Sequence, residues 1–386
     1  MMALSPRLRV WSLLMGIFSI RFFTMQGVQN VFLSQATKQA MTLFLLSNLI
    51  ACGGGDDTPG PSNTAGKHEH VLELEDMQRE FIVYVPEQVA TMQNVPLLFM
   101  FHGTTGTGEK FYNISYWREK ADQENFIAVF PSALTYCYRE DTDYDGHKEL
   151  RFTTKWASGE LGNTGDEGLP LCTADELAML PPEKQALADH PLKDDVAFVD
   201  AMLDFILANY SIDPKHIYAS GFSNGGGMVI RLAVERSERF AALSASAGVI
   251  RVPPLPAARA HSFVFAVGAE DEAGLLSFNQ GLPANEQALS LPLDESLFTV
   301  VPAFKHMVVD PLLEVLQLKD ISIFESALIN GVQTGQFRFA NSMVGEGNSL
   351  TVIIMAGLEH QYPNGHNHPI VMADYLWDFF KDKRLP

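Results

Sequence analysis

From residue 70 onward, short apolar runs alternate with segments whose apolar residues recur at helical spacing. Residues 95–101 are continuously apolar, which is typical of a strand buried on both faces of a sheet. Val196, Val199 and Leu203 form one stripe, which predicts a helix over 195–210 with Asp195 as its N-cap. The expected strands are 70–74 and 79–85 (an antiparallel pair), 95–101, 126–131, 216–220, 240–247, 262–268 and 350–356, and 369–381 is expected to form a closing helix. This alternation predicts an α/β domain with a mostly parallel central sheet and helices on both faces.

Two long stretches depart from this alternation. Residues 135–193 are irregular and rich in Gly, Pro, Tyr and acidic residues, and they contain two of the three cysteines. A stretch of this length in a compact domain is usually a functional lid or a disordered insert. Residues 273–345 contain one helix-like segment, 309–318, and separate the last two expected strands.

Residues 221–225 read Gly-Phe-Ser-Asn-Gly between an expected strand and an expected helix. In a G-x-S-x-G turn, the glycines permit a sharp bend and the serine hydroxyl projects above the sheet. The strand before the motif, and the helical spacing of Met228, Ile230 and Leu232 after it, supply the context that this motif requires. The alternative is a Gly-rich helix start with an ordinary N-cap serine. We predict Ser223 as a nucleophile.

A serine nucleophile needs a base in contact with it and an acid that orients the base. On an α/β scaffold with this turn, the acid and then the histidine follow the serine along the chain. Asp271 lies just beyond the carboxyl end of the expected strand 262–268, with Glu270 as the alternative acid. His360 lies at the exit of the last expected strand and is the predicted base.

Three other histidines are alternatives to His360. His366 and His368 form a His-x-His pair, which can also bind a metal ion. No acid or cysteine at ligand spacing accompanies this pair, so we expect the two side chains to line the turn before the closing helix and expect no metal. His102 precedes the serine and ends a different strand.

The oxyanion of a tetrahedral intermediate needs preorganised N–H donors. The backbone N–H of Asn224 directly follows the nucleophile at a helix N-terminus and supplies one donor. Residues 102–106 read His-Gly-Thr-Thr-Gly after the third strand, where this scaffold places the second donor. We assign that donor to Thr104, with Thr105 as the alternative. The other interpretation of residues 102–106 is a Gly-rich turn with no catalytic role.

The chain is acidic: 27 Lys and Arg against 46 Asp and Glu give a formal net charge of −19. A surface of this sign repels phosphate backbones, so nucleic acid is not an expected partner.

The N-terminal region differs in charge from the rest of the chain. It contains no acidic residue, because all Asp and Glu residues follow Cys52. An apolar run over 41–51 follows Lys38 and ends in Leu-Ile-Ala before Cys52, which resembles a bacterial lipobox. The pattern predicts a lipoprotein signal peptide cleaved before a diacylated Cys52, with a plain secretory signal or a buried helix as alternatives. Gly53, in place of Asp, favours the outer membrane over inner-membrane retention.

The predicted organisation is therefore a signal region over 1–51 (with Met25 as an alternative start), a flexible tether over 52–69 and a catalytic domain over 70–386 with an insert at 135–193. The expected location is the outer membrane or cell surface, or otherwise the periplasm or the medium.

Two cysteines, Cys137 and Cys172, remain once Cys52 is set aside. An exported compartment permits a disulfide between them. Two separate buried thiols are the alternative.

Together, these motifs resemble the secreted esterases that include poly(3-hydroxybutyrate) depolymerases, feruloyl esterases and acetylxylan esterases, over residues 79–384. The resemblance rests on Phe-His102-Gly, Asp195-Val-Ala-Phe-Val, Gly-Phe-Ser223-Asn-Gly-Gly, Gly-x-x-Asp271 and Gly-x-x-His360-x-Tyr-Pro. One position departs from the pattern, because Val267 stands where the family often has a histidine.

The resemblance implies an α/β-hydrolase fold and a Ser223–Asp271–His360 triad that cleaves carboxylic esters through an acyl-enzyme, without a cofactor. The implied substrates are hydroxyalkanoate esters or acyl groups on plant polysaccharide. A serine peptidase on the same fold and a non-catalytic surface-binding lipoprotein are the alternative functions.

Aromatic residues close to these motifs are the candidates for the walls of a substrate pocket. They are Phe222, Tyr362 and, from the insert, Tyr136, Tyr138 and Trp156.

Overall fold

The computed structural model describes residues 63–142, 146–164, 168–345 and 347–386. The predicted signal region, residues 52–62 of the tether and the lipidation site at Cys52 lie outside the described residues. Strand β1 (Gly66–Leu74) begins within the range assigned to the tether, so residues 66–69 belong to the sheet. Among the described residues, no helix is both long enough and apolar enough to cross a membrane.

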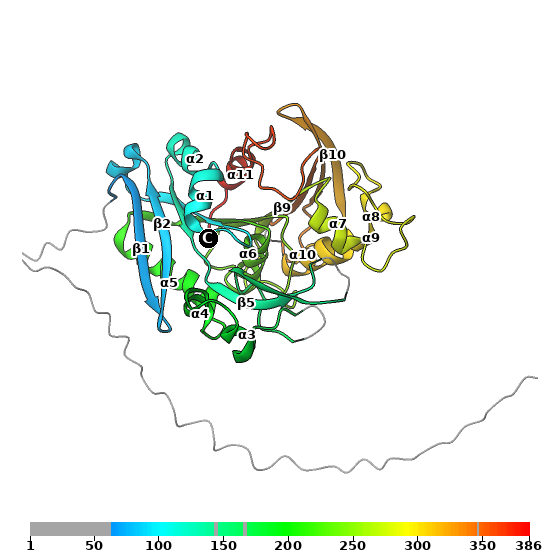
Figure 1. The fold of residues 1–386 in the computed structure, drawn as a ribbon. Helices are drawn as coiled ribbons and strands as arrows, with labels where there is room; N and C mark the ends of the chain where they lie inside the picture. Colours follow the sequence, from blue (N-terminus) through cyan, green and yellow to red (C-terminus); the bar gives the residue numbers. More distant parts are fainter. Residues whose placement is uncertain (1–62, 143–145, 165–167, 346) are drawn as a thin grey trace, which may run out of the picture. The chain divides into compact units, whose positions relative to one another are not determined.

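A sheet of ten strands organises the described part of the chain (Figure 1). Its order is β1-β2-β4-β3-β7-β8-β9-β12-β11-β10. The strands from β4 to β12 in this order run parallel, and antiparallel strands flank them on both sides. The mostly parallel sheet expected from the sequence is therefore confirmed. Besides β1, the strands are β2 (Met77–Val85), β3 (Val95–Phe101), β4 (Ile127–Pro131), β7 (Ile212–Phe222), β8 (Ala242–Ser246), β9 (Ser262–Gly268), β10 (Ser322–Ile329), β11 (Val332–Phe339) and β12 (Leu350–Met355).

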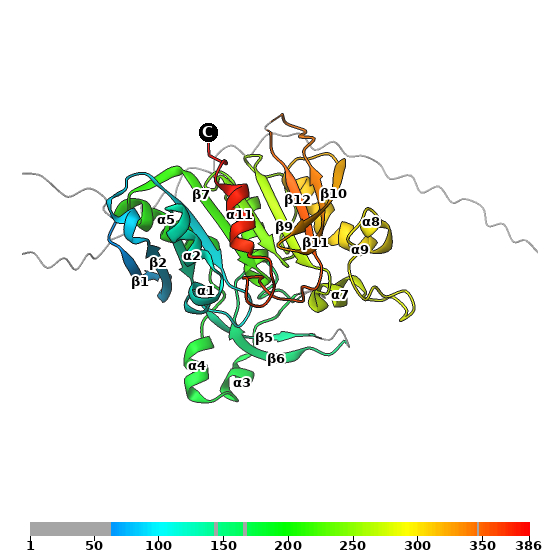
Figure 2. The same cartoon turned by 90° about the horizontal axis from the view of Figure 1, so that it is seen from above.

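Helices cover both faces of this sheet, as Figure 2 shows. Alternate residues of β3 serve the two faces: Leu97 and Phe99 belong to one core cluster, and Leu98 and Met100 belong to the other. The first cluster includes residues of α5 (Asp195–Asn209), α6 (Asn224–Glu235) and α10 (Asp310–Val315), and the second includes residues of α1 (Gly108–Ile114), α2 (Trp117–Glu124) and α11 (Met372–Phe380). The continuous apolar run of β3 thus follows from burial on both sides.

Residues 273–345 contain more regular structure than the sequence predicted. Strands β10 and β11 form an antiparallel hairpin that extends the sheet beyond β12. Asn330 and Gly331 connect these strands with φ angles of 50° and 80°, as a tight hairpin turn requires. The helical segments before the hairpin are α7 (Glu272–Phe278), α8 (Leu297–Val300), α9 (Pro302–Phe304), a π-helical turn (Lys305–Val309) and α10.

Helix α5 begins differently from the expectation. Asp194, not Asp195, is its N-cap, and the Asp194 side chain accepts a hydrogen bond from Val196 N. Asp195 is fully buried and forms an ion pair with buried Arg79 at 2.5 Å, while its second oxygen accepts from Ala157 N at 2.7 Å. The Asp195 carboxylate therefore joins β2, α5 and the insert.

The insert is folded, although the sequence predicted an irregular stretch. Its hairpin, β5 (Thr135–Glu140) and β6 (Glu149–Thr154), forms a separate two-stranded sheet. Two short helices follow, α3 (Ala174–Ala178) and α4 (Pro182–Ala188). A short 3₁₀ helix, Glu87–Thr91, lies outside the insert between β2 and β3.

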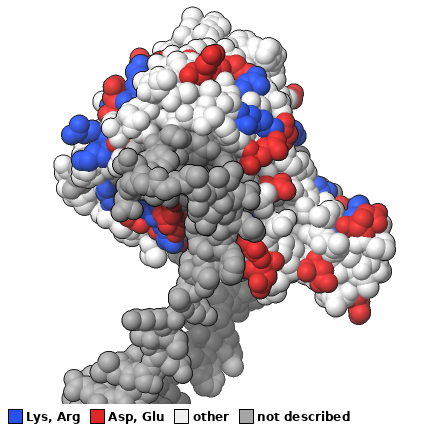
Figure 3. All heavy atoms as spheres, turned by 90° about the vertical axis from the view of Figure 1, so that its left-hand side faces the viewer, with Lys and Arg blue, Asp and Glu red and all other residues white. Residues whose placement is uncertain are grey.

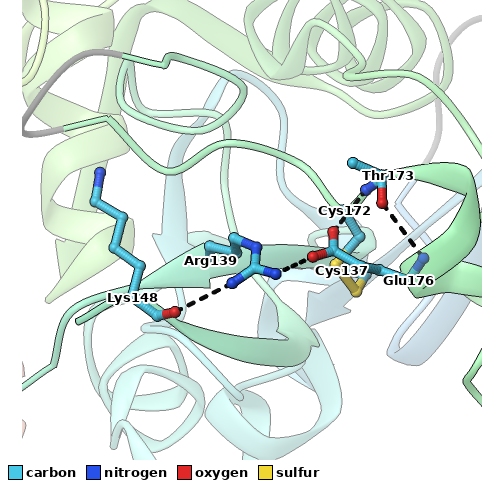
Figure 4. Close-up of a disulfide and its surroundings, with 6 residues drawn as sticks. All are labelled: Cys137, Arg139, Lys148, Cys172, Thr173 and Glu176. Atoms are coloured by element: carbon cyan, nitrogen blue, oxygen red, sulfur yellow. Dashed lines mark hydrogen bonds and ion pairs between the residues drawn. A yellow bond between two sulfur atoms is a disulfide. The ribbon is translucent and has the colours of Figure 1, made fainter.

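Cys137 and Cys172 form a disulfide within the insert, with an S–S distance of 1.97 Å. Figure 4 shows Arg139 beside this bond, with its guanidinium paired to Glu176. Glu176 also closes a capping box with Thr173 at the start of α3. The disulfide and the ion pair together attach α3 to strand β5.

Charged side chains of both signs lie next to one another on the face of the molecule shown in Figure 3. Ion pairs such as Arg239–Asp204 (2.6 Å) and Arg236–Asp200 (2.7 Å) involve partly exposed side chains. Exposed pairs of this kind contribute only about 0–1 kcal/mol each. The stability of the domain therefore depends mainly on its buried apolar clusters.

Candidate active site

The turn between β7 and α6 holds Ser223 in a strained conformation, with φ 54° and ψ −122°. A side chain at Gly221 would place its Cβ 2.2 Å from the carbonyl oxygen of Gly225. At Gly225, a Cβ would lie 2.3 Å from the carbonyl oxygen of His102. Both glycines are therefore required by close backbone contacts, as the G-x-S-x-G interpretation expects.

Ser223, His360 and Asp271 come together at the carboxyl ends of the parallel strands. Ser223 Oγ lies 2.9 Å from His360 Nε2, and His360 Nδ1 lies 3.0 Å from each oxygen of Asp271. Asp271 is 2% exposed and caps α7 by accepting from Gly274 N at 2.8 Å. The alternative acid, Glu270, has an exposed side chain.

The surroundings of His360 favour its protonated form. Burial lowers the pKa of His360, but the hydrogen bond and charge of Asp271 and the charge of Glu272 raise it by more, so the net pKa lies above the ordinary value. The Asp271 carboxylate accepts a hydrogen bond from Nδ1–H of His360, which leaves Nε2 of the neutral imidazole as an acceptor for the Ser223 hydroxyl. An imidazole in this arrangement can take a proton from serine and hold it.

Two of the three alternative histidines, His102 and His368, are buried and have other hydrogen-bond partners. His102 is buried, its Nδ1 lies 2.7 Å from Gly103 O, and its Nε2 accepts from Ala133 N at 3.0 Å. Burial lowers the pKa of His102 to about 4. His368 is also buried, with Nε2 3.0 Å from Ala356 O, whereas His366 is exposed.

The candidate oxyanion donors line the same pocket as Ser223. Asn224 is the first residue of α6, so its backbone N–H has no acceptor within the helix. Thr104 lies in the turn after β3 and lines the pocket. The N–H of the alternative residue, Thr105, donates instead to Thr154 O at 3.1 Å. Thr104 therefore remains the predicted second donor.

Two side chains at the site, those of Glu272 and Asn224, make contacts that were not anticipated from the sequence. Glu272 Oε2 accepts from the backbone N–H of His360 at 3.0 Å. The Asn224 side chain bonds to Trp156 N (2.6 Å), Trp156 O (3.1 Å) and Ser158 Oγ (3.0 Å), which fixes the insert to the turn. The sequence indicated a role for Asn224, because this residue directly follows the nucleophile. It did not indicate the role of Glu272, because the contacted residue, His360, lies 88 residues away.

The pocket at Ser223 encloses about 210 Å³ and is lined mostly by polar side chains and small residues. The aromatic residues expected in its wall are mostly in the core. Trp156 and Tyr362 are 0% and 4% exposed, and their polar atoms bond internally to His102 O (2.8 Å) and Trp117 Nε1 (2.9 Å). Tyr136 and Tyr138 are also buried.

Phe222 is the exception among these aromatic residues. Its ring is partly exposed and packs against the His360 ring, with 5.1 Å between ring centroids. It therefore contacts the proposed base directly.

A family model described as the prolyl oligopeptidase family matches residues 184–254. This segment spans α5, β7, the turn at Ser223, α6 and β8. The mostly parallel sheet and the strand–turn–helix at Ser223 give the described part of the chain an α/β-hydrolase fold.

Named relatives support the esterase resemblance. A protein of Aspergillus niger named "Probable feruloyl esterase C" is 32% identical over 126 residues, which is 30% of this chain and 47% of that protein. The chain covers less than half the length of the curated relatives that it matches.

Two solved structures are also similar. The acetyl xylan esterase from Aspergillus awamori aligns over 82% of this chain and 99% of its own, at 14% identity and a TM-score of 0.48. An S-formylglutathione hydrolase from Agrobacterium tumefaciens aligns over 84% and 98%, at 17% identity and a TM-score of 0.46.

We expect loss of the disulfide to weaken the insert, which contributes Glu140, Lys155 and Ser158 to the pocket. The bond closes a loop with a sequence separation of 35 residues, which corresponds to about 3.5–4 kcal/mol in the chain-entropy model. The double variant Cys137→Ser/Cys172→Ser should unfold several degrees lower. It should also raise KM for bulky esters more than for acetate esters. Thermal unfolding and KM measurements test this, and unchanged values for both would contradict it.

Proposed function

We propose that this chain is a serine carboxylesterase that works through an acyl-enzyme. The observation that carries the proposal is the hydrogen-bonded series from Ser223 Oγ through His360 to Asp271 at a strained strand–turn–helix. His360 Nε2 takes the Ser223 proton as Oγ attacks the ester carbonyl. The backbone N–H groups of Asn224 and Thr104 stabilise the oxyanion. His360 then protonates the leaving alcohol, and water releases the acid by the reverse sequence of proton transfers.

For the substrate, we propose the esters that feruloyl esterases or acetylxylan esterases hydrolyse, with 3-hydroxybutyrate esters as the other candidate. The name of the Aspergillus niger relative supports the first. Turnover of methyl ferulate, short acetate esters and 3-hydroxybutyrate oligomers separates these possibilities, and no added cofactor should be needed.

A serine peptidase is the second candidate function, because the matching family model is described as the prolyl oligopeptidase family. An amide has a poorer leaving group than an activated ester, so peptidase activity requires stronger stabilisation of the transition state. We expect turnover of 4-nitrophenyl butyrate to exceed that of a peptide anilide by orders of magnitude. The opposite order would favour the peptidase. No turnover of either would favour a non-catalytic binding protein.

We also propose that the mature protein is exported and anchored by lipid at Cys52, in the outer membrane or at the cell surface. The lipobox-like sequence before Cys52 supports this location. Mass spectrometry should find a diacylated N-terminal cysteine, and the Cys52→Ser protein should leave the detergent phase. An unmodified N-terminus at another position would contradict the anchor.

The pH dependence of hydrolysis should reflect the raised pKa of His360. Only neutral His360 can accept the Ser223 proton, so activity is lost as the pH falls through this pKa. We therefore expect the acidic limb of the kcat/KM profile above the ordinary histidine value of ~6.5. Glu272→Gln keeps an acceptor for the His360 N–H but removes a negative charge, so its limb should move to lower pH. A profile recorded with 4-nitrophenyl acetate from about pH 5 to 9 tests this. A wild-type limb below that value, or a shift in the other direction, would contradict it.

A further inference from the structure

Four charged side chains line the pocket that contains Ser223 and His360. They are Glu140, Lys155, Glu160 and Arg251. The first three belong to the insert, and Arg251 follows β8 in the α/β core. We call these four residues the charged wall. None of them takes part in the proposed proton transfers.

The members of the charged wall pair with one another. Lys155 Nζ lies 3.1 Å from Glu160 Oε1 and 3.4 Å from Glu140 Oε1. Glu160 Oε2 lies 2.9 Å from Arg251 Nε. The Lys155 side chain is only 5% exposed and that of Glu160 only 13%. Charges buried to this extent need close partners, and these contacts hold the ionic groups in place beside the pocket.

Burial lowers the pKa of Lys155, but the charges of Glu160 and Glu140 and the hydrogen bond to Glu160 contribute to a net rise above the ordinary value. The ammonium group therefore stays protonated. With two acidic and two basic groups, the charged wall has no formal net charge, so it offers no general attraction to an anionic or cationic substrate.

A second cavity of about 150 Å³ adjoins the charged wall. Glu140, Glu160 and Arg251 line both cavities. The second cavity adds Lys148, Gln280 and Met307 to the lining. A substrate that extends from Ser223 toward this space would therefore contact the charged wall.

The chemistry of the charged wall favours some substrates over others. An alkyl chain placed there removes water from ionic groups without replacing its hydrogen bonds, which is unfavourable. A hydroxyl group can donate to Glu140 or Glu160 and accept from Lys155 or Arg251. A site built to bind a hydroxyl discriminates strongly against an analogue that lacks it.

We infer that Lys155, Glu160 and Arg251 are specificity-determining residues, which select esters with hydroxyl groups close to the ester bond over plain alkyl esters. This inference rests on the proposed esterase function and defines the substrate class at the same site. The hydroxyl group can belong to the acid, as in a 3-hydroxyalkanoate, or to the alcohol, as in a sugar. Both sources present the same chemistry to the charged wall.

Two matched substrate pairs test the inference and separate the two sources. On the acid side, 4-nitrophenyl 3-hydroxybutyrate is compared with 4-nitrophenyl butyrate. On the alcohol side, a monoacetylated methyl xyloside is compared with cyclohexyl acetate. We expect kcat/KM to favour the hydroxylated member of at least one pair by about tenfold or more. Equal values in both pairs would overturn the inference but leave the esterase function intact, whereas no hydrolysis of any ester would refute the function itself.

Variants then assign the preference to the charged wall. Glu160→Gln and Arg251→Met should each lower the preferred pair's ratio by about fivefold or more, mainly through KM of the hydroxylated substrate. Lys184→Met is the matched control, because Lys184 belongs to the same insert but lines a different cavity. Its ratio should stay at the wild-type value. Using a ratio within one preparation corrects for partial unfolding. Unchanged ratios in both wall variants, or an equal loss in Lys184→Met, would overturn the assignment.

Discussion

Replacing Ser223 with alanine should lower kcat/KM for a short ester by about four to six orders of magnitude, because no other hydroxyl occupies the strained turn beside His360. The fold should survive the change. The Ser223 backbone N–H donates to Ser246 O at 2.8 Å, and alanine keeps this bond. Steady-state kinetics with 4-nitrophenyl acetate and thermal unfolding of both proteins measure the two effects. The residual rate should match that of the oxyanion donors and binding alone.

A fluorophosphonate probe gives an independent measurement, because it labels an activated serine covalently. The wild-type protein should be labelled, and Ser223→Ala should not. Ser220→Ala is a matched control, since Ser220 lies three residues earlier within β7, is buried and has no assigned catalytic role. It should retain labelling. Labelling that persists in Ser223→Ala, or disappears in Ser220→Ala, would assign the nucleophile to another residue.

The central sheet could be predicted from the sequence, because strands that are buried on both faces of a sheet consist of continuous apolar runs. The expected strands 95–101 and 262–268 coincide with β3 and β9. The expected strands also predicted where the acid and the histidine lie, because the carboxyl ends of parallel strands lie at one edge of the sheet. The structure places Asp271 and His360 after neighbouring parallel strands, β9 and β12.

The hairpin of β10 and β11 was missed because this edge of the sheet is largely exposed. Ile323 and Leu328 on β10 are each 74% exposed, so apolar residues do not mark a buried face there. The Asn330-Gly331 pair was the available signal, since both residues readily adopt the positive φ of a tight hairpin turn. Turn chemistry was more informative here than hydrophobic periodicity.

The pocket lining was the least predictable part of the site. Aromatic residues suit both a substrate pocket and a core, and only their contacts distinguish these roles. Trp156 donates to His102 O at 2.8 Å, which places it beneath the turn and not in the pocket. The charged wall depends on Lys155 meeting Glu160 and on Glu160 meeting Arg251, 91 residues further along the chain. Contacts between residues so far apart along the chain cannot be predicted from a local sequence pattern.

Removal of the proposed base should be almost as damaging as removal of the nucleophile. His360→Ala should lower kcat/KM nearly as far as Ser223→Ala, and the double variant should be little worse than either. The reason is that Ser223 Oγ and His360 Nε2 act as one unit across a 2.9 Å contact. Asp271→Asn should cost less than either change, because it leaves the base in place and removes the charge that stabilises its protonated form. Measurement of kcat/KM with one ester for the three single variants and the double variant tests this prediction.

Two histidines serve as controls for this prediction. His366 is exposed, and His368 Nε2 is held by Ala356 O at 3.0 Å, so neither reaches Ser223 in the structure. His366→Ala should retain nearly full activity. His368→Ala should lower thermal stability, through loss of a buried hydrogen bond, more than it lowers kcat. If either variant lost as much activity as His360→Ala without unfolding, the base would have to come from residues 366–368. If instead the losses in Ser223→Ala and His360→Ala multiplied in the double variant, the two side chains would act independently, and the proposed proton transfer between them would be wrong.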